Sequence, residues 1–106
     1  MKVIVEGHRY ELENFEDKDR DGQILQFIHK DKGVDTNDPT KLVTVDDGTT
    51  NEEVLAVLID RLNYLNGKFP CPENSIAIRK LREGLFWLNE RTRERVARQV
   101  EGKNLA

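Results

Sequence analysis

Residues 50–88, TNEEVLAVLIDRLNYLNGKFPCPENSIAIRKLREGLFWL, decide the fold class of this chain. Thr50 and Glu53 form a capping-box signature, in which a hydroxyl and a carboxylate satisfy the free amides at the start of a helix. Apolar residues then recur every three or four positions, as on one face of a helix: Val54, Leu58, Leu62 and Leu65. Asn66-Gly67 is a typical helix end. The sequence therefore predicts a first helix between Thr50 and Gly67.

A second helix is predicted after the prolines of residues 69–72, FPCP, which disfavour helical backbone on both sides. It is expected to begin near Asn74 or Ser75, either of which can cap it. Its apolar seam consists of Ile78, Leu81, Leu85 and Leu88. Beyond Leu88 the helix becomes polar, so this chain's own core cannot hold it. We expect this end to cross a partner subunit or to lie over a ligand site.

The first half of the chain has the short β-rich segments of a small antiparallel sheet. The predicted strands are Val3–Val5, Tyr10–Phe15, Ile24–Ile28 and Leu42–Val45. Gly7 and His8 indicate a turn, and residues 31–40 indicate an exposed loop. We predict an α+β fold in a single domain: a sheet of three or four strands in residues 1–48, then a two-helix hairpin in residues 49–106. A sheet this thin must pack on the helices or on a neighbour, and we expect the hairpin to mediate oligomerisation.

Composition narrows the class of protein further. The 106 residues carry a net charge of −3 and 35% charged side chains, which argues against a general nucleic-acid binder. Cys71 is the single cysteine, so no intrachain disulfide can form and a reducing compartment is expected. We identify no apolar signal core and no stretch long enough to span a membrane. The expected location is the cytoplasm.

An arginine ladder, Arg91, Arg95 and Arg98, lies at the end of the second helix. Spacings of four and three residues place these side chains on one helical face, where guanidinium groups suit phosphate oxygens. Trp87 continues the stripe upstream, while Tyr64 and Asn74 offer a stacking surface and an amide. The alternative is a solvated helix face whose arginines form ion pairs with Glu90, Glu94 and Glu101.

Signatures of catalysis and of metal binding are missing from the sequence. Residues 17–22 imitate the start of a calcium-binding EF-hand loop, but its twelfth position is Ile28 and not glutamate. His8 and His29 lack a motif that would supply further metal ligands. Cys71 has no adjacent base. We therefore predict a binding protein with no catalytic residue, no metal and no cofactor.

Three segments of the chain resemble a known family. They are DGTTNEEVL at residues 47–55, the connector LN-x-KFPCPENSIAI from Leu65 to Ile78, and WL-x-x-RT-x-x-R from Trp87 to Arg95. Together they are similar to the helical hairpin of the phage anti-Thoeris type-one family. The run from Leu58 onward also resembles that hairpin, so that the likeness covers about half of the chain.

The resemblance implies a sponge that acts in the host cytoplasm. Family members bind cyclic ADP-ribose isomers such as glycocyclic ADP-ribose without cleaving them, and some also bind the cyclic di- or trinucleotide signals of CBASS immunity in a higher oligomer. Carried over by motif, the signal-contacting residues are Tyr64, Asn74, Arg91 and Arg95, with Arg98 and Trp87 as secondary contacts. Tyr64 departs from the phenylalanine that we expect in the family.

Three expectations about partners and function follow. The ligand is a small cyclic nucleotide, the assembly is a homo-oligomer (a dimer or a dimer-built hexamer), and neither membrane nor DNA is a partner. The first alternative function is a hydrolase of the same signal, which product formation would reveal. The second is a phage structural or nucleic-acid-binding module, which salt-dependent DNA binding would reveal.

Overall fold

The computed structural model describes residues 1–33 and 40–98, which fall into two compact units, Met1–Thr50 and Asn51–Ala106. The first unit contains small antiparallel sheets and the second contains two helices, which confirms the predicted α+β class. That both units form one domain stays a prediction. Each unit is described by itself.

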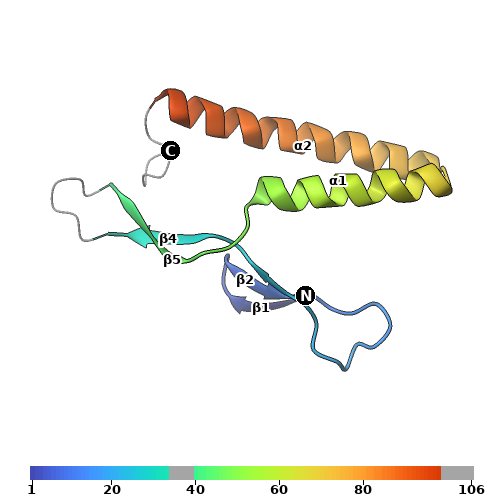
Figure 1. Ribbon diagram of the computed structural model, residues 1–106, viewed down its shortest axis with the longest axis horizontal. Coiled ribbons are helices and arrows are strands. Elements are labelled where there is room, and N and C mark those ends of the chain that lie inside the picture. The colour runs from blue at the N-terminus through green and yellow to red at the C-terminus, as the bar shows by residue number, and fades with distance from the viewer. Residues whose placement is uncertain (34–39, 99–106) are drawn as a thin grey trace. The chain divides into compact units, whose positions relative to one another are not determined.

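The described part of the first unit contains five strands in two sheets, some of which are labelled in Figure 1. Strands β1 (Lys2–Val5), β2 (Arg9–Glu11) and β3 (Ile24–Gln26) form a three-stranded antiparallel sheet in the order β1-β2-β3. Strands β4 (His29–Lys32) and β5 (Leu42–Asp46) form a separate antiparallel pair. The turn predicted at Gly7 is confirmed, and its φ of 78° is a value that glycine adopts without strain.

The prediction of a single sheet was wrong, because the third predicted strand ends early, at Gln26, and a strand that was not predicted, β4, begins at His29 and pairs with β5 in a second sheet. The sequence of β4, HKDK, lacks an apolar alternation and was assigned in part to the loop. Phe27 separates the sheets by forming an isolated parallel bridge with Thr49. Gly48 allows the two backbone segments of this bridge to approach closely, since a Cβ at position 48 would lie 2.4 Å from the carbonyl oxygen of Gln26. The predicted strand Tyr10–Phe15 also ends early, at Glu11.

Polar and aromatic contacts hold much of the first unit together. The rings of His8 and His29 stack with centroids 3.7 Å apart and planes 9° from parallel. Asp46 Oδ2 lies 3.9 Å from His29 Nδ1 and 3.7 Å from Arg9 Nη2, and Arg9 also donates to the side chain of Gln26. This cluster joins the β1–β2 turn to β4 and β5 without a hydrophobic core.

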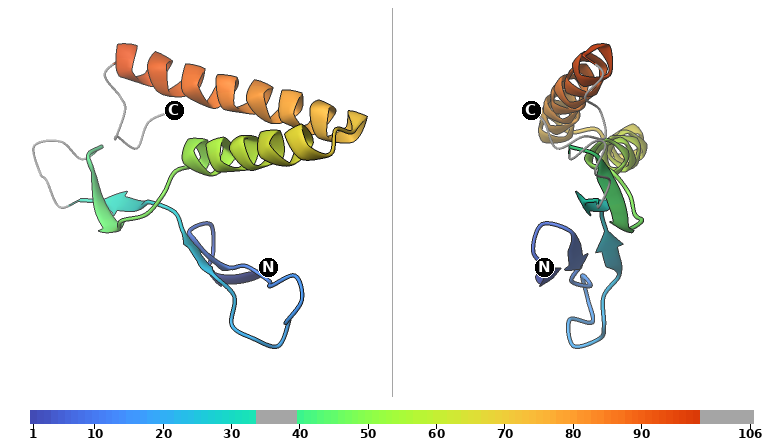
Figure 2. Two further views of the ribbon diagram at one scale, coloured as in Figure 1. Left: turned by 45° about the vertical axis from the view of Figure 1, so that its right-hand side comes forward. Right: turned by 90° about the vertical axis from the view of Figure 1, so that its left-hand side faces the viewer.

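The second unit is an antiparallel helical hairpin of α1 (Asn51–Lys68) and α2 (Pro72–Ala97), which lie side by side in Figures 1 and 2. Helix α1 begins after Thr50, at the predicted cap. The seam of α2 is confirmed, with Ile78 buried and Leu81, Leu85 and Leu88 half-buried. The face of α1 is confirmed at three of its four predicted positions, since Val54, Leu62 and Leu65 are half-buried. Leu58 is the exception, with 42% of its surface exposed.

The start of α2 also differs from the prediction. The helix begins at Pro72, and Cys71 is the N-cap, with its Sγ accepting a hydrogen bond of 3.4 Å from the backbone N–H of Asn74. Proline suits the first position of a helix because it lacks an N–H group that would have no partner there. Asn74 is therefore inside the first turn, and its side chain is not needed for capping.

The core of the hairpin is thin. Among the described residues, Ile78 is the single buried hydrophobic side chain, while Val57, Tyr64, Ile76, Phe86 and Trp87 are each 47–64% exposed. Exposed apolar residues in this number on a two-helix unit are typical of a surface that a partner covers. Neither described helix is long and apolar enough to span a membrane.

Candidate functional site

The connector end of the hairpin is fixed by Asn66. Its side-chain Nδ2 donates to Ser75 Oγ at 3.1 Å, and its Oδ1 accepts from the backbone N–H of Cys71 at 3.0 Å. These two bonds join the last turns of α1 to the first turn of α2. They fix the positions of Tyr64 and Asn74, two of the predicted contact residues, at the same end of the unit.

Tyr64 and Asn74 are both accessible at this end. Tyr64 is 60% exposed, and Asn74 is half-buried with a side-chain amide that makes no hydrogen bond within the described residues. Lys68 Nζ lies 4.8 Å from the centroid of the Tyr64 ring, one helical turn further along α1. An aromatic ring and a cation thus lie close together at the connector end, and a free amide belongs to the same end of the unit.

Tyr64 also borders an open hollow of about 620 Å³. The other lining residues, Glu53, Ala56, Val57, Asp60 and Arg61, all belong to α1. This volume falls within the range of small-molecule sites. One helix cannot enclose a ligand, however, so a second wall has to come from outside α1.

The arginines of α2 differ from one another in their surroundings. Arg91 is exposed and forms no ion pair or hydrogen bond with any described residue. Arg95 is buried, with 6% of its surface exposed. Arg98 forms an ion pair with Glu94 at 2.6 Å. The three arginines of the predicted ladder therefore have different surroundings, and their role as ligand contacts stays a prediction.

Two arginines at this end of the chain form ion pairs with nearby acids, as in the alternative interpretation of a solvated helix face. Besides Arg98, Arg93 donates to Glu90, and this hydrogen bond together with the carboxylate charge raises the pKa of Arg93. Both pairs arise because acids stand three or four residues before the arginines. Glu101, the third acid considered for such pairs, lies outside the described residues. Trp87 is 64% exposed, and its ring meets that of Phe86 edge-on.

The predicted contact residues form two groups that one hairpin does not bring together. Asn74 and Arg91 are 17 residues apart on α2, which corresponds to about 25 Å along the helix. A spherical pocket of about 1,000 Å³, the upper end for small-molecule sites, is only about 12 Å across. A single small ligand therefore cannot touch both groups on one chain.

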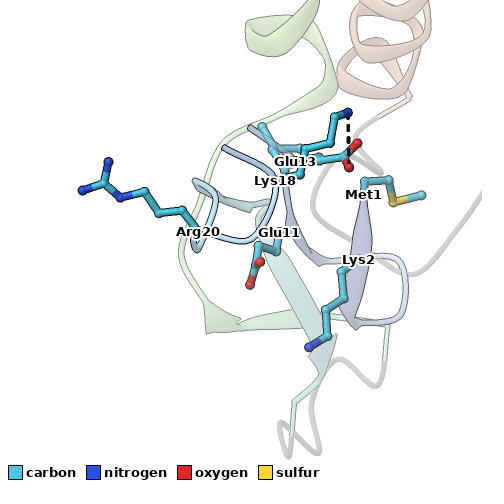
Figure 3. Close-up of a pocket in the computed structure, with 7 residues that line it drawn as sticks. Met1, Lys2, Glu11, Glu13, Lys18 and Arg20 are labelled. Carbon is cyan, nitrogen blue, oxygen red and sulfur yellow. Dashed lines mark ion pairs between the residues drawn. The ribbon is translucent and has the colours of Figure 1, made fainter. Parts of the chain in front are cut away.

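A smaller pocket in the first unit is less suited to a nucleotide. It has a volume of about 210 Å³ and is lined by Met1, Lys2, Glu11, Leu12, Glu13, Lys18 and Arg20. Figure 3 shows Lys18 turned to Glu13, with which it forms an ion pair of 3.4 Å, while Arg20 and Lys2 point away from each other. Cations that diverge do not form an anion site. Within residues 1–33 and 40–98, no three His, Cys, Asp or Glu side chains gather as metal ligands.

Sequence reasoning missed two residues of the connector end. The role of Asn66 could have been inferred only in part, because its partners lie nine and five residues away across the turn. Lys68 follows Tyr64 by four residues, a spacing that predicts a contact on one helical face and that the analysis of the sequence did not use.

Replacing Asn66 with alanine is expected to lower the free energy of unfolding by about 1–2 kcal/mol, because the half-buried N–H of Cys71 loses its acceptor. Chemical denaturation at fixed protein concentration measures this change. Asn63→Ala is the matched control: Asn63 bonds only to the Ile59 carbonyl of its own helix, so the expected change is within about 0.5 kcal/mol. Equal losses in the two variants would show that Asn66 does not hold the connector.

Comparison with known proteins identifies the family. The sequence profile described as "Acb2/Tad1, hairpin domain" matches residues 27–93, a region that contains Tyr64, Asn74, Trp87 and Arg91 and ends before Arg95. Thoeris anti-defense 1 of Bacillus phage SBSphiJ7 is 54% identical over 56 residues, which make up 52% of this chain and 39% of that protein. The chain thus spans well under half the length of this relative. Because the profile covers more than half of the chain, the protein belongs to the Acb2/Tad1 hairpin family, the anti-Thoeris family that its sequence resembles.

Proposed function

We propose that the protein is a phage anti-defence sponge, which binds a cyclic nucleotide signal of the glycocyclic ADP-ribose type and holds it without cleavage. By removing this signal from the host cytoplasm it inhibits Thoeris immunity. A secondary capacity for the cyclic di- or trinucleotides of CBASS belongs to the same proposal. The family membership and the name of the phage relative support an anti-Thoeris role.

Arg91 is the observation that carries the proposal. It is an exposed guanidinium without an ion-pair partner among the described residues, in a helix whose neighbouring Arg93 and Arg98 are both paired with acids. A free guanidinium can form a bidentate contact with a phosphate at no cost of breaking an internal ion pair. Trp87, one turn upstream and 64% exposed, adds a stacking surface beside it.

The site that we propose lies between two chains. Tyr64 and Asn74 of one protomer meet Arg91 of the other, because about 25 Å of helix separates Asn74 from Arg91 within one chain. An antiparallel pair of hairpins related by a two-fold axis creates two such sites. The partner also supplies the second wall that the hollow beside Tyr64 lacks. Arg95 joins the site if its buried side chain is released on binding.

Binding without turnover follows from the kinds of side chain at the proposed site. They supply a stacking ring, an amide and guanidinium groups, which hold a ligand but do not attack it. Neither a nucleophile next to a base nor a cluster of metal ligands is found at this site within the described residues. We therefore propose that the protein is not an enzyme.

Ligand recovery tests this function. After incubation with glycocyclic ADP-ribose and removal of the free ligand, heat denaturation is expected to release the intact compound in an amount close to one molecule per chain. Liquid chromatography with mass spectrometry measures the released species. Recovery of ADP-ribose would establish the hydrolase alternative, and no recovery of any nucleotide from the native protein would contradict the proposal.

The protein is also expected to be an obligate oligomer, because the hairpin has one buried hydrophobic residue in its described part and many exposed ones. Sedimentation equilibrium at micromolar concentration should give a mass at least twice 12.3 kDa, with a folded circular dichroism spectrum. A folded monomer under these conditions would contradict both the oligomer and the two-chain site.

A further inference from the structure

We propose that Lys68 is a further ligand contact of the same site, and that it binds a phosphate close to the base stacked on Tyr64. This inference rests on the proposed function and adds a residue and a specificity to it. It begins from the position of Lys68 Nζ, 4.8 Å from the centroid of the Tyr64 ring.

The geometry places the ammonium group over one face of the ring. Lys68 is the last residue of α1 and stands one turn after Tyr64, so both side chains lie on the same side of the helix. A cation attracted to the face of an aromatic ring keeps a preferred position even at an exposed site. Tyr64 is 60% exposed, so a base can reach the ring beside the ammonium group.

The charge of the site requires a second cation. A diphosphate linking two sugars carries two negative charges, and Arg91 supplies one accessible guanidinium. Arg95 is buried and Arg98 is paired with Glu94, so neither is presented to a ligand in this structure. Lys68 forms no ion pair with any described acid. Arg61 lines the hollow beside Tyr64, but Lys68 is the cation that the structure places over the Tyr64 ring, and its ammonium group therefore supplies a second charge at this end.

This placement also predicts which nucleotides the site prefers. A phosphate bound by Lys68 must lie near the base on Tyr64, while a neighbouring phosphate reaches Arg91 of the other protomer. A cyclic diphosphate holds its phosphates folded back beside the base, and a linear one such as ADP-ribose must give up conformational freedom to do so. Lys68 thus favours cyclic over linear ligands.

The test is calorimetric titration of glycocyclic ADP-ribose and of ADP-ribose into the full chain. Lys68→Met keeps the aliphatic stem and removes the charge, and it is expected to weaken binding of the cyclic ligand by about tenfold or more. The preference of this variant for the cyclic over the linear ligand should also fall. The affinity of the variant should depend less on salt concentration than that of the wild type. Lys68→Arg should restore affinity to within about threefold of the wild type, because a cation remains at this place.

The control is Lys30→Met, which makes the same change of net charge on an exposed residue of β4 in the other unit. We expect less than about a twofold change in its affinity, because Lys30 is not one of the proposed contact residues. If the wild type binds and Lys68→Met behaves like Lys30→Met, the assignment of Lys68 is wrong while the sponge function stands. If the wild type binds neither ligand, the proposed function fails and the Lys68 contact fails with it. Equal thermal unfolding of the variants excludes a loss of fold as the cause.

Discussion

Arg91→Ala is expected to weaken binding of glycocyclic ADP-ribose by about 2–4 kcal/mol, which corresponds to a loss of tens- to several-hundred-fold. The exposed guanidinium of Arg91 has no ion-pair partner among the described residues, so its whole hydrogen-bonding capacity is available to a phosphate. Removing it leaves a bound phosphate without its charged donor. Calorimetric titration at fixed salt concentration measures the loss.

Arg93 provides a matched control two residues away. Its side chain is paired with Glu90 and points to another face of α2, so Arg93→Ala should change affinity by no more than about 0.5 kcal/mol. Arg91→Lys should still lose most of the binding, because an ammonium group cannot make the bidentate contact of a guanidinium. Arg95→Ala is a poorer probe, since that residue is buried and its replacement also disturbs packing.

Two results would contradict the role of Arg91. Equal losses at Arg91 and Arg93 would mean that the site responds to total positive charge alone. Wild-type affinity in Arg91→Lys would mean that a point charge is sufficient and that the proposed bidentate contact is wrong. Either result would leave family membership untouched, because membership rests on the sequence match and not on this contact.

Mixing two inactive variants should restore part of the binding if each site is built from two chains. Tyr64→Ala and Arg91→Ala each damage both sites of a two-fold dimer, and each alone should lose most of the affinity. In a heterodimer of the two variants, one site carries both substitutions and the other carries neither. After unfolding and refolding an equal mixture, about a quarter of all sites should bind with wild-type affinity.

The stoichiometry of high-affinity binding measures this recovery, with each variant refolded alone as the control. No high-affinity sites in the mixture, although native mass spectrometry shows that heterodimers have formed, would place the whole site within one chain. That outcome conflicts with the separation of about 25 Å between Asn74 and Arg91, and would require a bend in α2. Recovery near a quarter would establish the two-chain site directly.

The sequence by itself determined the local parts of this protein. The three-to-four-residue periodicity predicted both helices, and the capping box placed the start of α1 after Thr50. The glycine at position 7 predicted the first turn, and the connector and arginine motifs led to the family. These features depend on interactions between residues within a few positions of one another, and such interactions can be recognised without knowing the rest of the fold.

Contacts between distant residues decided what the sequence left open. Strand β4 is polar, and it is a strand because the backbone of β5 pairs with it. The pattern of its own residues therefore does not predict it. Leu58 is exposed although it shares the predicted apolar face with the half-buried Val54 and Leu62, because helix packing decides which apolar residues are covered.

The candidate site shows the same division. Spacing placed Arg91, Arg95 and Arg98 on one helical side and Glu94 four residues before Arg98, with which it pairs. Tertiary structure decided that Arg91 is exposed and Arg95 is buried. The sequence named Tyr64, Asn74 and Arg91 as contacts, and only the hairpin showed that Arg91 lies at the far end from the other two. Local spacing fixes where a residue lies on its helix and which charges of that helix it can pair with, whereas burial depends on the surfaces that folding brings against it from elsewhere in the chain.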